Sequence, residues 1–280
     1  MCLFLPAFLV RFGFQSYMLS QFLLILALYL NFQNTAHRTL WWTLLLSLAG
    51  IINFYLFAMV FALWIANLFD VWHTSDRASH RALIKEILIA LASIIFLFWQ
   101  AGYFEATGSS IISNMYGTAR MNALSIFDPA GWSILLKKIL PHYGGFTNHR
   151  LESMHFLGLG VFFLAPFSFW ALYKNRNLTS AFFRQHLALC IMLICLTFFA
   201  ISNQVDIGNI HFTIPLPDTI LSLASILRSS GRMFLPVLYA IVFAMIALIC
   251  VYFQRKQAIS ILFVACLIQI VDTSDAWNTK

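Results

Sequence analysis

The stretch "LWWTLLLSLAGIINFYLFAMVFALWIANLF", residues 40–69, contains no charged residue over 30 positions. A helix that crosses the hydrocarbon core of a bilayer needs about 20 apolar residues, so this run is too long for one helix and too short for two full ones. Gly50 and Asn53 interrupt it near its middle. We therefore expect two short helices, over 39–51 and 54–70, with Asn53 capping the second.

The remainder of the chain has the same apolar character. Hydrophobic residues make up 61% of the 280 positions and charged residues only 10%, whereas soluble domains are about 45–50% apolar. The five cysteines all fall in apolar stretches, so we expect neither a disulfide framework nor a metal site. The predicted fold is an all-α polytopic transmembrane bundle of about eight helices, forming one domain over 1–280. Its further helices are expected over 17–31, 86–102, 155–174, 182–201, 234–253 and 258–271, with an interfacial or re-entrant segment over 2–10.

The basic residues predict the orientation of this bundle. If the helices alternate in direction, nine Lys and Arg residues fall in short connections on one side, which the positive-inside rule assigns to the cytoplasm. These residues are Arg38, Arg77, Arg81, Lys85, Lys174, Arg176, Arg184, Arg255 and Lys256. Positive-inside topology also explains most of the net charge of +7, so we expect no nucleic-acid partner. The opposite, outer side carries two long loops, 103–154 and 202–233.

The first outer loop is long enough to hold a functional or partly folded segment. Its apolar pattern predicts an interfacial helix over about 130–140, between the Asp128–Pro129 turn and Pro141. Asp128 fits a turn residue better than a catalytic acid. Glu152 and His155 are three residues apart and would share one helix face as an acid/base pair, although capping or pairing with Arg150 explains Glu152 equally well.

The second outer loop ends in "LRSSGRMF", residues 227–234, which carries two arginines on the side that should be poor in them. An amphipathic helix is expected from Asp218, as its N-cap, to Leu227, with Gly231 in a left-handed conformation after it. Arg228 and Arg232 would then flank a bend at the membrane surface. Guanidinium groups bind phosphate in bidentate fashion, so this pair is a candidate clamp for a lipid phosphate. The alternatives are snorkelling to ordinary phospholipid or a salt bridge to Asp206, Asp218 or Glu152.

Several enzyme and transporter classes lack their signatures here. The sequence has no Walker loop, dinucleotide-binding glycine pattern, HExxH motif or nucleophile elbow. Proton-coupled transporters use charged residues in the middle of their membrane helices. The predicted helices contain no such residue, because Glu86 and Arg184 fall near helix ends. ATP-driven transport is therefore not expected of this chain, and no cofactor is indicated.

Three motifs carry a resemblance to a known group of proteins: "RMNALSIFDPAGWS" (120–133), "ESMHFLGLG" (152–160) and "LRSSGRMFLPVLY" (227–239). Together with "NFYLFAMVFALWIANL" (53–68) they resemble an uncharacterised family of bacterial polytopic membrane proteins. That family is similar to the GT-C glycosyltransferases, which transfer sugars from polyprenyl-phosphate donors at the outer face of the membrane. Ser153 departs from the pattern, which has Gly after the acidic residue.

The resemblance implies a membrane-embedded, glycosyltransferase-like protein of the bacterial inner membrane, with membrane lipid and a polyprenyl-phosphate sugar as partners. Arg228 and Arg232 would hold the phosphate, Glu152, His155 and Asp128 would line the acceptor side, and Asn122 would hydrogen-bond a sugar. GT-C enzymes carry a catalytic acid in their first outer loop, and no segment before Tyr17 matches it. We therefore expect the chain to be incomplete at its N-terminus, with an N-terminal half or partner subunit. The alternatives are a transporter or flippase of lipid-linked sugar and a non-catalytic assembly subunit.

Overall fold

The computed structural model describes residues 1–14, 16–33, 37–74, 77–105, 116–136 and 154–275. Helices dominate these residues, and one two-stranded antiparallel hairpin lies in the second outer loop. The α-helices are α1 (Pro6–Phe14), α2 (Phe22–Phe32), α3 (Arg38–Ile52), α4 (Phe54–Thr74), α5 (Arg77–Gln100), α6 (Leu159–Lys174), α7 (Arg176–Gln185), α8 (Leu187–Ile201), α9 (Asp218–Ala224), α10 (Leu235–Tyr252) and α11 (Arg255–Asp272). The strands are β1 (Gln204–Ile207) and β2 (Ile210–Thr213), and the short 3₁₀ helices are η1 (Cys2–Phe4), η2 (Ser16–Gln21), η4 (Ser225–Leu227) and η5 (Ser230–Phe234).

The break inside the long apolar run is where the sequence predicts it. Helix α3 ends at Ile52 and α4 begins at Phe54. The Asn53 side-chain oxygen accepts a hydrogen bond from the Tyr55 backbone N–H at 2.8 Å, so Asn53 caps α4 as expected. The 182–201 segment differs, because it forms two helices, α7 and α8, that meet at His186.

Within the described part of the chain, three helices are long and apolar enough to cross a membrane: Phe54–Thr74, His80–Gln100 and Ser230–Tyr252. A helix lies in each of the eight predicted segments, and the all-α class is supported. The count of about eight spans is not supported, because the other apolar helices found among the described residues are shorter. Helix α3, for example, has 15 residues, which at 1.5 Å per residue extend about 22 Å against a hydrocarbon core of about 30 Å.

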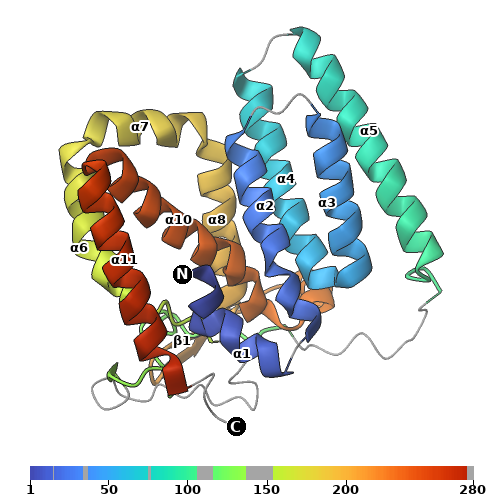
Figure 1. Ribbon diagram of the computed structural model, residues 1–280. Helices are drawn as coiled ribbons and strands as arrows, with labels where there is room; N and C mark the ends of the chain where they lie inside the picture. Colours follow the sequence, from blue (N-terminus) through green and yellow to red (C-terminus); the bar gives the residue numbers. More distant parts are fainter. Residues whose placement is uncertain (15, 34–36, 75–76, 106–115, 137–153, 276–280) are drawn as a thin grey trace.

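The helices run up and down between two ends that differ in chemistry. The C-terminal ends of α2, α4 and α10 and the N-terminal ends of α3, α5 and α11 lie at the upper end in Figure 1, together with α7, which runs across that end. The basic residues that predict the cytoplasmic side all belong to this end, which we call the basic rim. The hairpin, α1 and the connections around α9 lie at the lower end. We call it the outer end, after the orientation that the sequence predicts.

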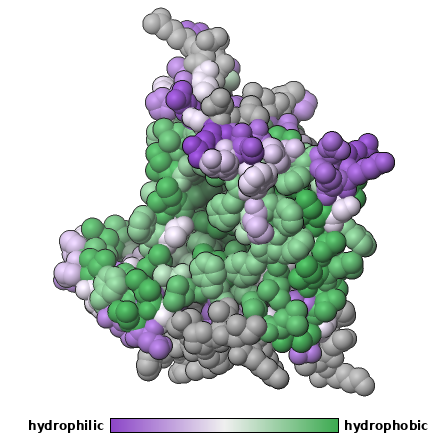
Figure 2. All heavy atoms as spheres, turned by 90° about the vertical axis from the view of Figure 1, so that its left-hand side faces the viewer, coloured by the Kyte–Doolittle hydropathy of each residue, from purple (hydrophilic) through white to green (hydrophobic). Residues whose placement is uncertain are grey.

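The core lies where α2, α4, α8 and α10 meet and is built from fully buried aliphatic and aromatic side chains, including Leu24, Leu63 and Leu238. The outside of the bundle is apolar as well. Figure 2 shows a broad hydrophobic band between polar ends on the face formed by α6 and α11, where Phe169 and Phe263 are 67% and 62% exposed. Exposed apolar surface of this extent suits a lipid environment.

Close packing of α6 on α11 explains the two glycines of the "HFLGLG" segment. A Cβ on Gly160 would lie 2.3 Å from the Ala265 carbonyl oxygen, and Gly158 has φ +88° with the Gln269 side chain against it. This left-handed residue also delays α6, which begins at Leu159 rather than at 155. The Gln269 side chain then accepts a hydrogen bond from the Gly160 N–H at 2.9 Å, so the start of α6 is fixed on α11.

Candidate functional site

The motif segments that are far apart in the sequence come together at the outer end. The Gly231 N–H donates to the Ala119 carbonyl at 3.0 Å, and the Leu157 N–H donates to the Ile126 carbonyl at 3.3 Å. The His155 ring packs edge-on against Phe234, with ring centroids 5.2 Å apart. The three motifs therefore form one packed unit below the helix bundle.

Arg228 and Arg232 lie in different environments within this unit. Arg228 is exposed, whereas Arg232 is 5% exposed and its guanidinium lies 4.8 Å from the centre of the Tyr55 ring. The Tyr55 hydroxyl accepts a hydrogen bond from the Ser229 N–H at 2.9 Å, which holds the bend against α4. Arg232 thus packs against the bundle as a cation–π pair, and Arg228 alone of the two faces outward.

Gly231 and Asp218 differ from their predicted roles. Gly231 lies in η5 and does not adopt a left-handed conformation. A glycine is needed at this position for another reason: a Cβ would lie 2.9 Å from the Ala119 carbonyl oxygen. Asp218 is the first residue of α9, and Pro217 occupies the N-cap position. The amphipathic helix itself is present as α9 followed by η4.

The most developed polar arrangement at the outer end is centred on Asp206 of β1. Arg120 forms a two-point ion pair with this carboxylate: its Nε lies 2.6 Å from Oδ2 and its Nη2 lies 2.9 Å from Oδ1. The His211 ring contacts Oδ1 through its Nδ1. The side chains of Arg120 and Asp206 are only 10% and 5% exposed, whereas that of His211 is 38% exposed. A solvent-facing imidazole is therefore backed by a buried carboxylate, which is in turn held by a guanidinium.

The β-hairpin creates this contact. Asp206 and His211 are directly opposite each other in the antiparallel register, and Gly208, with φ +60°, lies in the connecting turn. Asn122 holds the turn from outside: its amide nitrogen donates to the Gly208 carbonyl at 2.9 Å, and its oxygen accepts the Gly208 N–H at 3.0 Å. Asn122 thus positions the hairpin, and the sugar contact predicted for it has no support from this geometry.

Asp128 and His155, two of the other predicted site residues, make their contacts with residues outside the Asp206 cluster. Asp128 accepts a hydrogen bond from the Ala130 N–H at 3.0 Å and shapes the turn that leads to Gly131, as the turn interpretation predicts. His155 is fully buried against Phe234. Glu152, and with it the predicted Glu152–His155 pair, lies outside the described residues.

The interfacial helix expected over 130–140 is wrong for its described part, because residues 130–135 form turns and irregular structure and only residue 136 is in a 3₁₀ conformation. The cause is Asp272, at the end of α11 and fully buried. Its side chain accepts hydrogen bonds from the Ser133 hydroxyl at 2.5 Å and the Leu135 N–H at 3.4 Å, and its backbone carbonyl accepts the Ile134 N–H at 3.0 Å. These bonds satisfy the segment without a helix.

Tyr116 anchors the start of the first described outer segment. Its hydroxyl donates to the Phe199 carbonyl at 3.1 Å, at the end of α8. Burial raises the pKa of Tyr116 to about 12, so the hydroxyl keeps its proton at neutral pH and remains a donor. The segment leading to Arg120 is thereby fixed to the bundle.

Arg120 and His211 are the residues that sequence reasoning missed. Asp206 was considered only as a partner for Arg228 or Arg232, whereas its partner is Arg120. The available signal was the Asp206–Gly208–His211 spacing, which allows a tight hairpin with the acid opposite the imidazole. Among the described residues, no three His, Cys, Asp or Glu side chains come together to hold a metal ion.

Comparison with known proteins gives one match. The model of the family described as a domain of unknown function, DUF6311, matches residues 1–274. The chain belongs to this family. No curated protein matches it. No solved structure matches it either. The family match thus agrees with the resemblance to an uncharacterised family and carries no information about glycosyl transfer.

Proposed function

We propose that the protein is a membrane-embedded, GT-C-like glycosyltransferase that acts on polyprenyl-phosphate-linked sugars at the outer face of the bacterial inner membrane. The motif resemblance, the apolar band around the helices and the concentration of basic residues at the opposite rim support this proposal. The observation that carries it is the His211–Asp206–Arg120 arrangement at the outer end.

This arrangement suits general base catalysis. The Nδ1 edge of His211 faces Asp206, so the Nε2 edge points away from the carboxylate. An acceptor hydroxyl placed at that edge would attack the anomeric carbon of the donor sugar. The bond from that carbon to the phosphate oxygen breaks, the polyprenyl phosphate leaves with the electron pair, and the hydroxyl proton passes to Nε2. Asp206 would orient the ring and stabilise the imidazolium that forms.

The departing phosphate needs a positive partner. Arg228 is exposed at the same end of the bundle, on the segment that leads into α10. A guanidinium keeps its charge at any working pH and binds phosphate oxygens in pairs. Arg228 is therefore assigned to the donor phosphate, whereas the buried Arg232 supports the fold of the segment through Tyr55.

The test is sugar transfer in liposomes that contain the purified protein and a panel of radiolabelled polyprenyl-phosphate hexoses. His211→Gln is expected to lower the transfer rate about 100-fold or more, the usual contribution of a general base. His73→Gln, an exposed histidine near the basic rim, is the matched control and should leave the rate unchanged. Equal rates for wild type and His211→Gln would contradict the proposal. If such liposomes instead carry the lipid-linked sugar across the bilayer with both variants, a transporter is the better description.

A further inference from the structure

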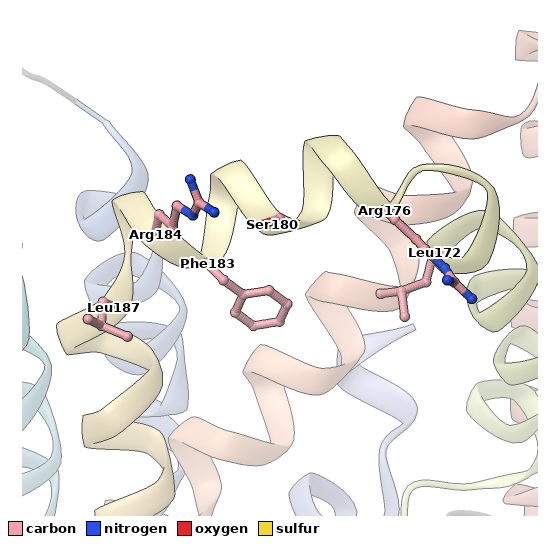
Figure 3. A pocket seen from close by; sticks show the side chains of 6 residues that line it. All are labelled: Leu172, Arg176, Ser180, Phe183, Arg184 and Leu187. Atoms are coloured by element: carbon pink, nitrogen blue, oxygen red, sulfur yellow. The ribbon is translucent and has the colours of Figure 1, made fainter.

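Helix α7 runs across the basic rim of the bundle, transverse to its neighbours α6 and α8 (Figure 1). Its sequence, "RNLTSAFFRQ", contains two arginines and no acidic residue. Figure 3 shows Phe183 pointing from α7 toward the bundle, whereas Arg184 lies on the opposite side of the helix. The helix is therefore amphipathic in the way expected for a segment at a membrane surface.

Two cavities lie beneath and beside helix α7. The first, of about 490 Å³, is an open groove lined by Leu172, Arg176, Ser180, Phe183, Arg184 and Leu187 (Figure 3). The second, of about 640 Å³, is almost wholly apolar and lies between α2, α8 and α10 with α7 above it. Its volume is within the range of about 300–1,000 Å³ that is usual for ligand sites.

The two cavities lie next to each other at Phe183, which is part of both linings. On one side of this ring the lining carries guanidinium and hydroxyl groups; on the other it consists of side chains such as Leu28, Leu193 and Ala244. A molecule that fills both must have an anionic head and an apolar chain.

The Arg176 guanidinium lies 4.5 Å from the centre of the Tyr173 ring, and neither arginine of the groove is neutralised by an acidic side chain of the described residues. No carboxylate among the described residues lies within 4.0 Å of Arg176 or Arg184. Arg184 also lines a third cavity, which contains one acidic residue, Asp70. The Asp70 carboxylate is already engaged, because it accepts the Ala188 N–H at 2.8 Å and the Leu189 N–H at 3.2 Å at the start of α8. The groove is thus electropositive and complementary to a phosphate.

We infer that this double cavity is a binding site for an anionic phospholipid of the cytoplasmic leaflet. The headgroup phosphate lies at Arg176 and Ser180, Arg184 adds positive charge at the other end of the groove, and one acyl chain passes Phe183 into the apolar cavity between α2, α8 and α10. Basic pockets between helices on this side of a membrane recognise anionic headgroups in this way. The inference is independent of the chemistry proposed for the outer end.

Native mass spectrometry of the detergent-purified full chain tests it, with phosphatidylglycerol and phosphatidylcholine of identical acyl chains as probes. Wild type should bind phosphatidylglycerol at least about 10-fold more tightly, since each surface arginine contributes on the order of 1 kcal/mol. The double variant Arg176→Gln/Arg184→Gln should lose this preference. Arg255→Gln/Lys256→Gln removes the same charge from the same rim without touching either cavity and should retain it.

A second pair of variants tests the acyl-chain compartment. Ala244→Trp fills the apolar cavity from an exposed position and should lower the affinity for both lipids, whereas Val251→Trp, also exposed on α10 but outside the cavity, should not. Equal binding of the two lipids by wild type would overturn the inference, as would equal loss in the two charge variants. Displacement of bound phosphatidylglycerol by millimolar inorganic phosphate would also overturn the inference. So would displacement by polyprenyl phosphate present at a tenth of the phosphatidylglycerol concentration, because the occupant would then be another phosphate compound.

Discussion

Two pairs of arginines, one pair at each end of the bundle, lie in different environments. At the outer end, Arg120 is held in a two-point ion pair with the buried Asp206, and Arg232 lies over the Tyr55 ring. At the basic rim, Arg176 and Arg184 are exposed, with no carboxylate of the described residues in salt-bridge range. A buried, paired charge specifies one structure, whereas an exposed charge at a membrane edge is available to lipid. This difference is consistent with the proposals of positioned chemistry at the outer end and lipid binding at the rim.

The largest effect is expected from breaking the outer ion pair. Asp206→Ala leaves Arg120 buried without its carboxylate and should lower the free energy of unfolding by about 3–5 kcal/mol. Arg184→Gln at the rim should change it by less than about 0.5 kcal/mol. Unfolding of the detergent-solubilised protein followed by circular dichroism measures both. Similar stabilities for the two variants would mean that the ends do not differ as described.

Close packing at the outer end should be the next most sensitive feature. Gly160→Ala places a Cβ 2.3 Å from the Ala265 carbonyl oxygen, so α6 must move away from α11. Overpacking of this kind costs about 1–3 kcal/mol. Gly102→Asn is the control: a Cβ there meets nothing within 4 Å, so this variant adds only the backbone strain of φ +74°, which Asn adopts more readily than most residues, and no overpacking. A melting temperature unchanged by Gly160→Ala would contradict the close approach of the two helices.

A smaller effect is expected where Asp70 of α4 caps α8 near the basic rim. Its carboxylate accepts the Ala188 and Leu189 N–H groups at the positive end of the helix. Asp70→Ala should destabilise the protein by about 1 kcal/mol, the usual value of a lost N-terminal cap. Asp70→Asn should retain part of the stability, and a variant series without this order would argue against capping.

The smallest effect concerns pH at the α7–α8 junction. Burial lowers the pKa of His186 below its ordinary value of about 6.5, partly offset by Asp70, so the fold favours the neutral ring. The stability that depends on the neutral His186 ring is present above the pKa that the ring has in the unfolded chain. It is lost as the pH falls through the lower pKa of the folded protein. Between pH 7.5 and pH 5 the melting temperature of wild type should fall slightly more than that of His186→Gln. An equal fall in both would exclude this contribution.

Apolar runs were sufficient to predict the helices, because each run is bounded by a polar or glycine break, such as Asn53 between α3 and α4. Bonds between distant segments were not predictable. Asp272 holds Ser133 across 139 positions and prevents the expected helix over the described residues 130–136. Arg120 likewise reaches Asp206 across 86 positions. Local sequence patterns do not indicate such contacts, so the Asp206 cluster was missed, and the phosphate clamp at Arg228 and Arg232 stays a prediction.

The assignment of the two ends to the two sides of the membrane underlies both the proposed chemistry and the lipid site, and cysteine labelling in intact cells tests it directly. In a chain whose five cysteines are replaced by Ala, Arg228→Cys and Arg184→Cys place one thiol at each exposed end. A membrane-impermeant maleimide should label Arg228→Cys in intact cells and should label Arg184→Cys only after lysis. The reverse pattern, or labelling of both variants from outside, would contradict the orientation.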